Sequence, residues 1–556
     1  MNDDYDVVIV GSGAGGAAAA LGLARGGARV LVLEAGPRYD PSQYGLDRPD
    51  WELSGFPDDR TAAGQRYTFA ELQPLDARWD TLRSWNRVWG IFNRTQRRQG
   101  LRYSHVRGVG GSTLHFSGEA HRLNPASMSM HAKFGVAADW PMSYDELEPW
   151  YEQAESIQGV AGRLEGSLRP RRSPYPLPAH RLSYASSVVV NRTGSLGLQW
   201  EPNSLAITSA PYDGRPACNY CANCNRGCPR GDKGSVEVTF LRHALATGRC
   251  SLLADSPVTH IEAGEGGRVR RVHYRAASGA TVVVAARVVV LACGAVETPR
   301  LLLLSRGPRS AEGLANESGM VGRHFMETLA WVSTGVHESP LGSHRGVSTD
   351  LISWRHNSPD SIPGVIGGCR FSVSNGESQL GPIGCAQRVV AGWGLGHKKA
   401  MRTTFGRTLA IGAIGESLPN DASYVDLDPD KKDAMGLLLP RIHSRLDEGD
   451  INRLHFMART TRAILAASGT PEIVEEYGTY DSFSSTHVFG TCRMGARPEM
   501  SVVDSTGRAH GWRNLFVADA SIFPSSGGGE SPSLTIQALA LRTADAIIRG
   551  MSRREL

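Results

Sequence analysis

Apolar and polar positions near the start of the chain predict a strand, a turn, a helix and a second strand. Residues 5–36, "YDVVIVGSGAGGAAAALGLARGGARVLVLEAG", contain two short apolar runs separated by a glycine-rich turn and an alanine-rich stretch. Short apolar runs bounded by glycine are typical of strands buried on both faces of a parallel sheet. The pattern therefore predicts a βαβ unit.

Later segments extend this pattern and add a different one. Apolar runs at 281–292 and 514–519 predict further buried parallel strands, so the parallel sheet is discontinuous in sequence. From 331 to 484, short strand-like pieces alternate with Gly, Pro and Asn, which favours an antiparallel sheet. We predict an α/β fold. Its Rossmann-like domain comprises 1–125, 210–330 and 485–556, and its second domain, an antiparallel sheet with helices, comprises 126–209 and 331–484.

The first turn carries a dinucleotide-binding signature. Gly11, Gly13 and Gly16 form G-x-G-x-x-G between the predicted strand and helix. At these positions a tight turn, the approach of a pyrophosphate and the packing of the helix each leave no room for a side chain. Glu34 ends the second strand, where a carboxylate accepts hydrogen bonds from a ribose diol.

The composition of the chain indicates which classes of binding partner to expect. The chain has 556 residues and a formal charge of +5, and its basic residues are mostly scattered arginines, which disfavours nucleic acid and favours a small molecule. No apolar window reaches about 18 uncharged residues, so no membrane span is expected. The start, MNDDYD, lacks a basic segment, and we expect a cytoplasmic protein without its own export signal. Export together with a partner subunit stays an alternative.

Four of the nine cysteines lie in one short run, "CNYCANCNRGCPRG", at 218–231. Cys218, Cys221, Cys224 and Cys228 have the spacing C-x2-C-x2-C-x3-C-P of a bacterial ferredoxin. No second such run exists, so a single iron–sulfur cluster would use three or all four thiolates. Zinc is one alternative, and thiols or a disulfide that only pack a loop are another.

Several separated segments resemble one family, the glucose–methanol–choline (GMC) flavoprotein oxidoreductases, in the family's order over nearly the whole chain. Besides the N-terminal unit they are "RGVGGSTLHFSGEAHRLNP" (107–125), "VVVLACGAVETPRLLLLS" (288–305), "GMVGRHFMET" (319–328), "ESLPNDASYVDLDPDKKDAMG" (416–436), and the C-terminal run from "HVFGTCRMG" (487–495) through "VADAS" to "GGGESPSLTIQALALR".

The resemblance implies FAD rather than NAD, with the adenine half on the N-terminal unit and the isoalloxazine facing the second domain. Gly110, Gly111 and Ser112 match a second glycine cluster that follows the flavin pyrophosphate towards the ring. Asp519 and Ala520 match a segment that contacts the ribityl chain and pyrophosphate. The discontinuous Rossmann-like domain is thus expected to be the FAD-binding domain.

The resemblance also implies alcohol oxidation, which requires removal of a hydroxyl proton and transfer of a hydride to flavin N5. His487 matches the family's catalytic histidine, and a neutral imidazole suits a general base. The usual second residue, His or Asn, is replaced by Ser531, whose hydroxyl reaches less far, and Glu530 beside it is a second polar group.

His115 lies four residues after Gly111. Some relatives attach the flavin 8α-methyl covalently to a histidine at this spacing. A histidine that packs beside the flavin without a bond is the alternative.

The expected function is FAD-dependent oxidation of a small-molecule alcohol, a sugar or glycoside hydroxyl among the candidates, to the carbonyl. The electron acceptor is O2, a quinone, a cytochrome or a diffusible carrier. One alternative is an oxidase of the same fold that reduces O2 to H2O2. Another is a non-catalytic module for electron transfer or redox sensing, which the complete motif around His487 disfavours.

Overall fold

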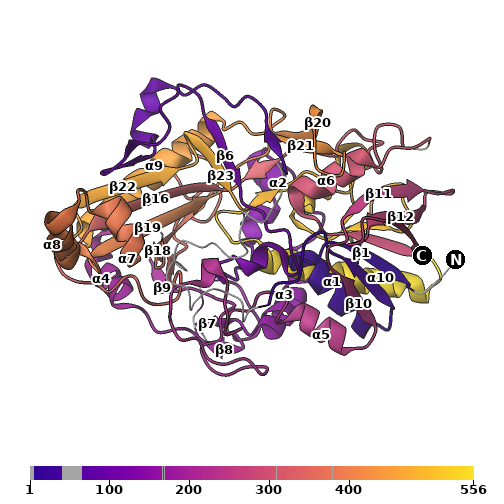
Figure 1. Cartoon of the computed structure of the whole chain (residues 1–556), viewed down its shortest axis with the longest axis horizontal. Helices are drawn as coiled ribbons and strands as arrows, with labels where there is room; N and C mark the ends of the chain where they lie inside the picture. The colour runs from indigo at the N-terminus through magenta and orange to yellow at the C-terminus, as the bar shows by residue number, and fades with distance from the viewer. Residues whose placement is uncertain are drawn as a thin grey trace.

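The computed structural model describes residues 5–40, 66–163, 165, 167, 169–308, 310–377 and 380–556. The predicted domain segment 1–125 therefore includes two stretches, 1–4 and 41–65, that lie outside the described residues. The described chain forms a parallel sheet with helices at one end and a large antiparallel sheet at the other (Figure 1). This confirms the predicted α/β class and the two kinds of sheet.

The five strands of the first sheet are all parallel and come from separate parts of the sequence. In spatial order they are β10 (Cys250–Leu253), β2 (Val30–Leu33), β1 (Val7–Val10), β14 (Val288–Leu291) and β25 (Leu515–Val517). The three central strands β2, β1 and β14 are buried along their whole length, which explains why they are apolar at every position. The discontinuous sheet agrees with the sequence pattern.

The prediction for 281–292 was half wrong. Only 288–291 joins the parallel sheet, whereas 281–285 forms β13 (Thr281–Ala285) of a separate antiparallel sheet. It pairs there with β12 (Val269–Arg275), which in turn pairs with β11 (Val258–Ala263). The side chains of β13 alternate between exposed and half-buried, so the run is apolar in sequence but forms an edge strand in the fold.

Helices cover the parallel sheet. Helix α1 (Ala14–Arg25) packs against α10 (Ser533–Ser552) and α5 (Phe240–Ala246), and α10 also packs against α3 (Tyr144–Gln158). Helix α6 (Gly294–Leu304) contacts β11. At the start of α1, a Cβ on Gly16 would lie 1.9 Å from the Gly11 carbonyl oxygen, so the helix follows the turn this closely only with glycine there.

The second sheet has eight strands, all of them antiparallel to their neighbours. In spatial order they are β5 (Gly90–Ile91), β4 (Trp85–Asn86), β22 (Glu472–Gly478), β16 (Leu329–Val336), β19 (Thr408–Gly415), β18 (Cys369–Ser374), β17 (Leu351–Ser353) and β9 (Trp200–Pro202). Helix α9 (Glu448–Ala467) packs on β16, β18 and β19 and closes a second apolar core.

Most strands of this sheet fall within the predicted second domain. Strands β4 and β5 join it from within 1–125, and β16 begins at Leu329. The domain boundaries themselves stay a prediction.

The remaining elements belong to neither of these two sheets. The remaining helices are α2 (Met130–Phe134), α4 (Tyr184–Arg192), α7 (Pro382–Gly384) and α8 (Gly394–Thr404). The remaining strands are β3 (Thr68–Phe69), β6 (Gln99–Tyr103), β7 (Ala161–Gly162), β8 (Leu177–Pro178), β15 (Met326–Glu327), β20 (Tyr424–Lys432), β21 (Leu438–His443), β23 (Ser482–Ser485) and β24 (Val488–Phe489). Within the described ranges, no helix combines the length and apolar character needed to cross a bilayer.

Candidate active site

The first predicted cofactor residues meet at the carboxyl ends of β1 and β2. One oxygen of Glu34, Oε2, accepts hydrogen bonds from the Ser12 amide (3.0 Å) and hydroxyl (2.7 Å), and Oε1 accepts one from the Gly36 amide (2.9 Å). Burial raises the pKa of Glu34 above its usual value although these bonds oppose it. Each carboxylate oxygen has more than one acceptor site, so Glu34 keeps capacity for a ribose hydroxyl.

The second predicted glycine cluster lies against the first. The Gly110 amide donates to the Ser12 hydroxyl (3.2 Å). A Cβ on Gly111, whose φ is +55°, would lie 2.8 Å from the Cα of Gly13. Ser112 is exposed in the same turn. Residues about a hundred positions apart in the sequence thus form one surface of bare backbone.

The C-terminal cofactor residues follow β25 at the same edge of the sheet. Asp519 Oδ2 accepts hydrogen bonds from the Gly294 amide (2.9 Å) and the Thr298 hydroxyl (2.6 Å) at the start of α6. Asp519 Oδ1 accepts one from the Ser521 amide (2.8 Å), and Ala520 between them is buried. The predicted residues therefore surround the crevice outside the carboxyl ends of the strands, where open α/β sheets bind their ligands.

FAD fits these residues. The amino terminus of α1 points its amides and its positive dipole end towards a pyrophosphate at the first turn. Gly111 admits no side chain where it faces Gly13, because a Cβ there would lie 2.8 Å from the Gly13 Cα. Glu34 supplies an acceptor for the adenosine ribose.

His487 lies between β23 and β24, and hydrogen bonds hold its main chain. Its carbonyl oxygen accepts from the Thr328 amide (2.9 Å) and the Ser485 hydroxyl (3.1 Å). Burial lowers the pKa of His487 to about 4; the charge of Glu119 opposes this shift and that of Arg370 adds to it. No hydrogen bond joins its ring nitrogens to another described residue. The imidazole is thus neutral at pH 7 and can accept a proton.

Ser531 is tied to a buried ion pair. Its hydroxyl donates a 2.6 Å hydrogen bond to Glu119 Oε2, and the same oxygen accepts from Arg370 Nη2 at 2.5 Å. Burial by itself raises the pKa of Glu119, but the charge of Arg370 and the bond from Ser531 help to bring it down to about 2. Glu119 is therefore a carboxylate, and the Ser531 proton is committed to it.

A second set of bonds closes a ring around Ser531. The Ser531 amide donates to His121 Nδ1 (3.1 Å), which makes Nε2 the protonated nitrogen, and Nε2 donates to Asn203 Oδ1 (2.8 Å). The Asn203 amide group then donates to Glu119 Oε1 (3.1 Å). Burial lowers the pKa of His121 to about 3, so the ring contains a neutral imidazole. Both the backbone and the side chain of Ser531 are held in place.

Glu530 faces a different group of partners. Its Oε1 accepts from Arg169 Nη2 (2.7 Å), the Asn124 amide (3.1 Å) and Asn357 Nδ2 (2.9 Å). Its Oε2 is buried without a hydrogen bond to a described residue. The Arg169 guanidinium also lies 3.8 Å above the ring of Trp354.

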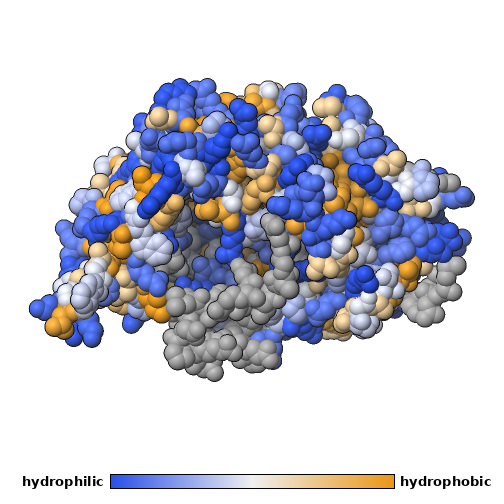
Figure 2. All heavy atoms as spheres, turned by 45° about the horizontal axis from the view of Figure 1, so that its top comes forward, coloured by the Kyte–Doolittle hydropathy of each residue, from blue (hydrophilic) through white to orange (hydrophobic). Residues whose placement is uncertain are grey.

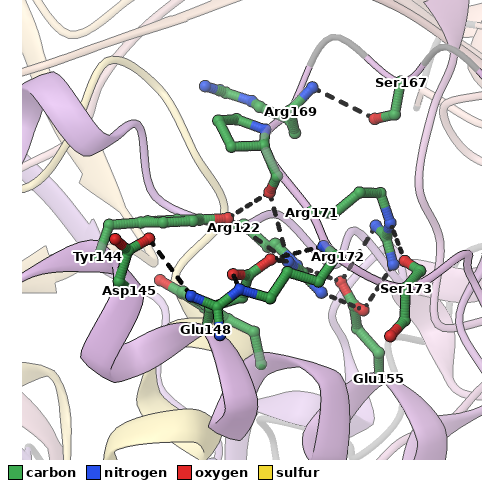
Figure 3. A network of polar contacts seen from close by, with 12 residues as sticks. Arg122, Tyr144, Asp145, Glu148, Glu155, Ser167, Arg169, Arg171, Arg172 and Ser173 are labelled. Atoms are coloured by element: carbon green, nitrogen blue, oxygen red, sulfur yellow. Dashed lines mark hydrogen bonds and ion pairs between the residues drawn. The ribbon is translucent and has the colours of Figure 1, made fainter.

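Buried ion pairs hold the segment that carries Arg169. Figure 3 shows Arg171 and Arg122 converging on α3. Glu155 accepts from Arg122 Nε (2.8 Å) and Arg171 Nη2 (2.8 Å), and Glu148 accepts from Arg122 Nη1 (3.1 Å). The ion pair of Arg171 with Glu155 thus anchors the segment two residues after Arg169, which itself bonds to Glu530.

The cysteine run contacts the predicted flavin segment. His115 Nδ1 donates to the Asn225 carbonyl (2.7 Å), so the lone pair of this neutral ring lies on Nε2. The fully buried Lys233 ammonium donates to the carbonyls of Leu114 (2.8 Å) and Cys224 (2.6 Å). The loop 218–233 is thus anchored beside His115.

The four thiols do not converge. Cys221 is exposed, Cys224 is buried, and the Cys228 thiol donates to Asp232 Oδ1 (2.9 Å). Burial raises the pKa of Cys228 to about 12 and also raises that of Cys218. In the part of the chain that the structure describes, no group of three or more His, Cys, Asp or Glu side chains is placed to hold a metal ion. As arranged, the loop does not fit a cluster or a zinc ion, and both stay predictions.

Sequence reasoning missed the polar residues around Ser531. Glu119 and His121 lie in the segment that also contains the second glycine cluster, and a buried Arg370 lies within the apolar strand β18. A charge inside a buried strand was the signal that could have identified Arg370. Asn203, in the connection after β9, had no such signal.

Comparison with known families agrees with this arrangement. Models of the GMC oxidoreductase family match residues 107–329 and 419–540, and a model described as an FAD binding domain matches residues 6–77. The FAD assignment thus has support from both sequence and structure.

Curated relatives match over nearly the whole chain. The 2-methyl-1,2-propanediol dehydrogenase of Mycolicibacterium austroafricanum is 29% identical, over 99% of this chain and 96% of its own. The fructose dehydrogenase large subunit of Gluconobacter japonicus is 30% identical, over 99% and 98%. The 6'''-hydroxyparomomycin C oxidase of Streptomyces lividus is 31% identical, over 98% and 91%.

Solved structures share the fold. The pyridoxine 4-oxidase of Mesorbium loti superposes with a TM-score of 0.63 at 19% identity, over 98% of this chain and 99% of its own. The formate oxidase of Aspergillus oryzae gives 0.66 at 16% identity, over 99% of each chain. The two family models and the full-length relatives together show that this chain belongs to the GMC oxidoreductases and is an FAD-binding enzyme of that family.

Proposed function

We propose that the protein oxidises one hydroxyl of a small polyhydroxylated alcohol, such as a vicinal diol or a sugar, to the carbonyl. The observation that carries the proposal is the neutral, half-buried imidazole of His487 within the electrostatic reach of the Glu119–Arg370 pair, which also holds Ser531. FAD, when bound, would accept the hydride that leaves the alcohol carbon, and with it the two electrons of the C–H bond.

His487 takes the hydroxyl proton. Its lowered pKa keeps the imidazole unprotonated, and its ring nitrogens are not engaged by other described residues. As the O–H bond breaks, its electron pair forms the second C–O bond of the product. The hydrogen on the same carbon leaves with both electrons of the C–H bond, as a hydride. The nearby Glu119 carboxylate stabilises the imidazolium that results, since the two charges are opposite.

Ser531 binds the substrate as an acceptor. Because its own proton is donated to Glu119, its oxygen presents lone pairs and not a hydrogen to a ligand. The His or Asn expected at this place can donate a hydrogen bond. A substrate with a second hydroxyl next to the reacting one would supply the donor that Ser531 needs, and this favours a diol or sugar over a simple alcohol.

The relatives support the same substrate class. Their names refer to a propanediol, to fructose and to a hydroxylated paromomycin, each of which carries more than one hydroxyl group. Both dehydrogenases and oxidases occur among them, so they do not decide between O2 and another electron acceptor.

The proposal includes covalent attachment of the flavin through His115. The hydrogen bond from Nδ1 to the Asn225 carbonyl fixes the tautomer with a lone pair on Nε2, the form that can bond to a flavin 8α-methyl group. The ring is also held by a loop that Lys233 anchors.

Anaerobic reduction of the bound flavin tests the function. The holoenzyme is mixed with propane-1,2-diol, with propan-1-ol as the matched control, and with a panel of sugars, and the loss of the yellow absorbance is followed. Faster reduction by diols and sugars, with the carbonyl product identified, is expected. No reduction by any alcohol would overturn the proposal. H2O2 measured in air then distinguishes oxidase from dehydrogenase.

A further inference from the structure

Two segments without a single acidic residue meet at one end of the eight-stranded sheet. Residues 81–118 contain seven arginines and residues 378–415 contain five lysines and arginines, and neither contains Asp or Glu. The Trp89 indole donates to the Gln387 carbonyl (2.8 Å), and Asn86 Nδ2 donates to the Arg388 carbonyl (2.8 Å). The parts that meet, residues 86–94 and 387–402, form a single surface that we name the basic corner.

The tip of the basic corner is apolar and exposed. Trp393 is 90% exposed and Leu395 is 77% exposed, and all residues from 391 to 396 are exposed. On the neighbouring hairpin, Trp89 is 55% exposed. Figure 1 places α8 at the far end of the molecule from β1, and Figure 2 shows hydrophobic spheres beside hydrophilic ones at that extremity.

The carboxyl-terminal end of α8 is packed against the rest of the protein. Met401 and Phe405, towards the end of α8, pack against a buried cluster that includes Cys385, Val389 and Val474. This contact fixes the helix to the sheet while its amino-terminal end, with Trp393 and Leu395, stays outside. The exposure is therefore built into the fold and does not come from a chain end.

The cations of the basic corner differ in whether they have a carboxylate partner. Arg87 is paired with Glu472. Arg388 is paired with Glu475 of β22. In contrast, Lys398, Lys399 and Arg402 of α8 make no ion pair with any residue in the described part of the chain, and their side chains are exposed. A row of unpaired positive charges next to exposed Trp and Leu is complementary to a surface that is negative outside and apolar beneath.

We infer that the basic corner docks the protein on an anionic lipid bilayer. Trp393 and Leu395 enter the boundary between headgroups and acyl chains, where an indole has both an apolar environment and polar partners for its N–H. Lys398, Lys399 and Arg402 then lie at the level of the phosphates, and their apolar stems cover the region between. This binding is peripheral and is separate from the proposed chemistry.

A second copy of the chain fits this surface less well. A two-fold dimer would place the same lysines against each other, and like charges across an interface are unfavourable. A stable dimer also needs about 800 Å² from each partner, whereas the exposed apolar part here is a narrow tip.

Vesicle flotation with the full-length holoenzyme tests the inference. We expect binding to vesicles of equimolar phosphatidylcholine and phosphatidylglycerol, weak binding to phosphatidylcholine alone, and loss of binding at high salt. Trp393→Ser with Leu395→Ser should weaken binding at least about tenfold, because it removes the buried apolar area. Lys398→Glu with Lys399→Glu should weaken it by a similar factor or more.

Matched controls separate this surface from general effects. Lys431→Glu with Lys432→Glu changes another exposed lysine pair, and Leu101→Ser changes another exposed apolar residue; both should bind as the wild type does. Flavin absorbance reports that each variant is folded. Absence of flotation with anionic vesicles, equal losses in the controls, or a dimer in light scattering that the Trp393 and Leu395 changes dissociate would each overturn the inference.

Discussion

The Ser531 hydroxyl and the Glu119 carboxylate form a 2.6 Å hydrogen bond, and the charge of the same carboxylate acts on the proposed catalytic histidine, His487. The bond determines which way the serine proton points, and Arg370 keeps the carboxylate ionised. Ser531 is thus held in a fixed network, and under the proposed function its oxygen would accept a hydrogen bond from the substrate.

Removal of this hydroxyl should therefore have a moderate effect. We expect Ser531→Ala to lower kcat/KM for a diol roughly 5–30-fold. This factor corresponds to about 1–2 kcal/mol of transition-state stabilisation, the contribution of one lost hydrogen bond. The loss for the matched simple alcohol should be smaller. Ser533→Ala, whose hydroxyl donates only to the Glu119 carbonyl, is the control. A loss as large as that of a His487 variant would make the serine a full catalytic partner.

The Glu119–Arg370 pair should also stabilise the fold. Glu119→Gln would leave the buried Arg370 without its opposite charge, and breaking such a pair costs about 3–5 kcal/mol. Glu262→Gln removes the partner of Arg271 at a half-exposed site and should cost about 0–1 kcal/mol. Denaturant unfolding of both variants gives the comparison, and equal costs would contradict the buried role of Glu119.

Replacement of His487 should separate catalysis from cofactor binding. We expect His487→Ala to retain FAD. The alcohol should reduce its flavin at least about a hundredfold more slowly than in the wild type, which is the lower end of the contribution of a general base. His510→Ala, away from the cluster around Ser531, should react like the wild type. Stopped-flow reduction at the wild-type rate would remove His487 from this role.

The pH dependence follows from the lowered pKa of His487. The base is active when unprotonated, so its rate falls only when the pH drops towards a pKa of about 4, and not near the usual histidine value of 6.5. The rate of flavin reduction should accordingly be flat from neutral pH down to about pH 5 and decline below it. An acid limb centred near 6.5 would show that the imidazole is more solvated than its burial indicates.

Local patterns in the sequence correctly predicted the first βαβ unit, on which the proposed cofactor residues lie. The turn Gly11–Gly16 and Glu34 belong to one βαβ unit, so their arrangement follows from short-range rules. The strand at 281–285 was assigned to the wrong sheet because an apolar run alone does not show whether both faces are covered.

The catalytic surroundings were harder to predict for a physical reason. Glu119, Arg370 and Ser531 are more than 150 positions apart in the sequence, and they meet only in the folded chain, where Glu119 Oε2 accepts hydrogen bonds from the other two. A buried ion pair requires both partners, and neither reveals the other locally. His487 was identified from its motif, whereas its network became visible only in the fold.

Acid precipitation tests the attachment of the flavin. If His115 carries it, the denatured pellet stays yellow, and His115→Ala should release the colour into the supernatant. His105→Ala, a buried histidine on the same stretch of chain, is the control and should leave the pellet yellow. A colourless wild-type pellet would mean that His115 only packs beside the cofactor.

Metal analysis and thiol titration decide the role of the cysteine run. In the present arrangement the Cys228 thiol donates to Asp232, and no group of three or more described metal-binding side chains is placed to hold an ion. Burial also raises the pKa of Cys218 and Cys228, which disfavours the thiolates that a metal requires. We therefore expect anaerobically purified protein to contain FAD without stoichiometric iron or zinc.

In the same sample, the exposed Cys221 should react first with a thiol reagent, and Cys221→Ser should remove that fast phase. Iron and acid-labile sulfide at several atoms per chain, with all four thiols protected, would show instead that the loop rearranges around a cluster. Such a rearrangement would break the bond between Cys228 and Asp232. It would also give electrons leaving the flavin a route to a cytochrome or quinone, because the loop already contacts His115. Without a cluster, the electrons pass to O2 or to a diffusible carrier.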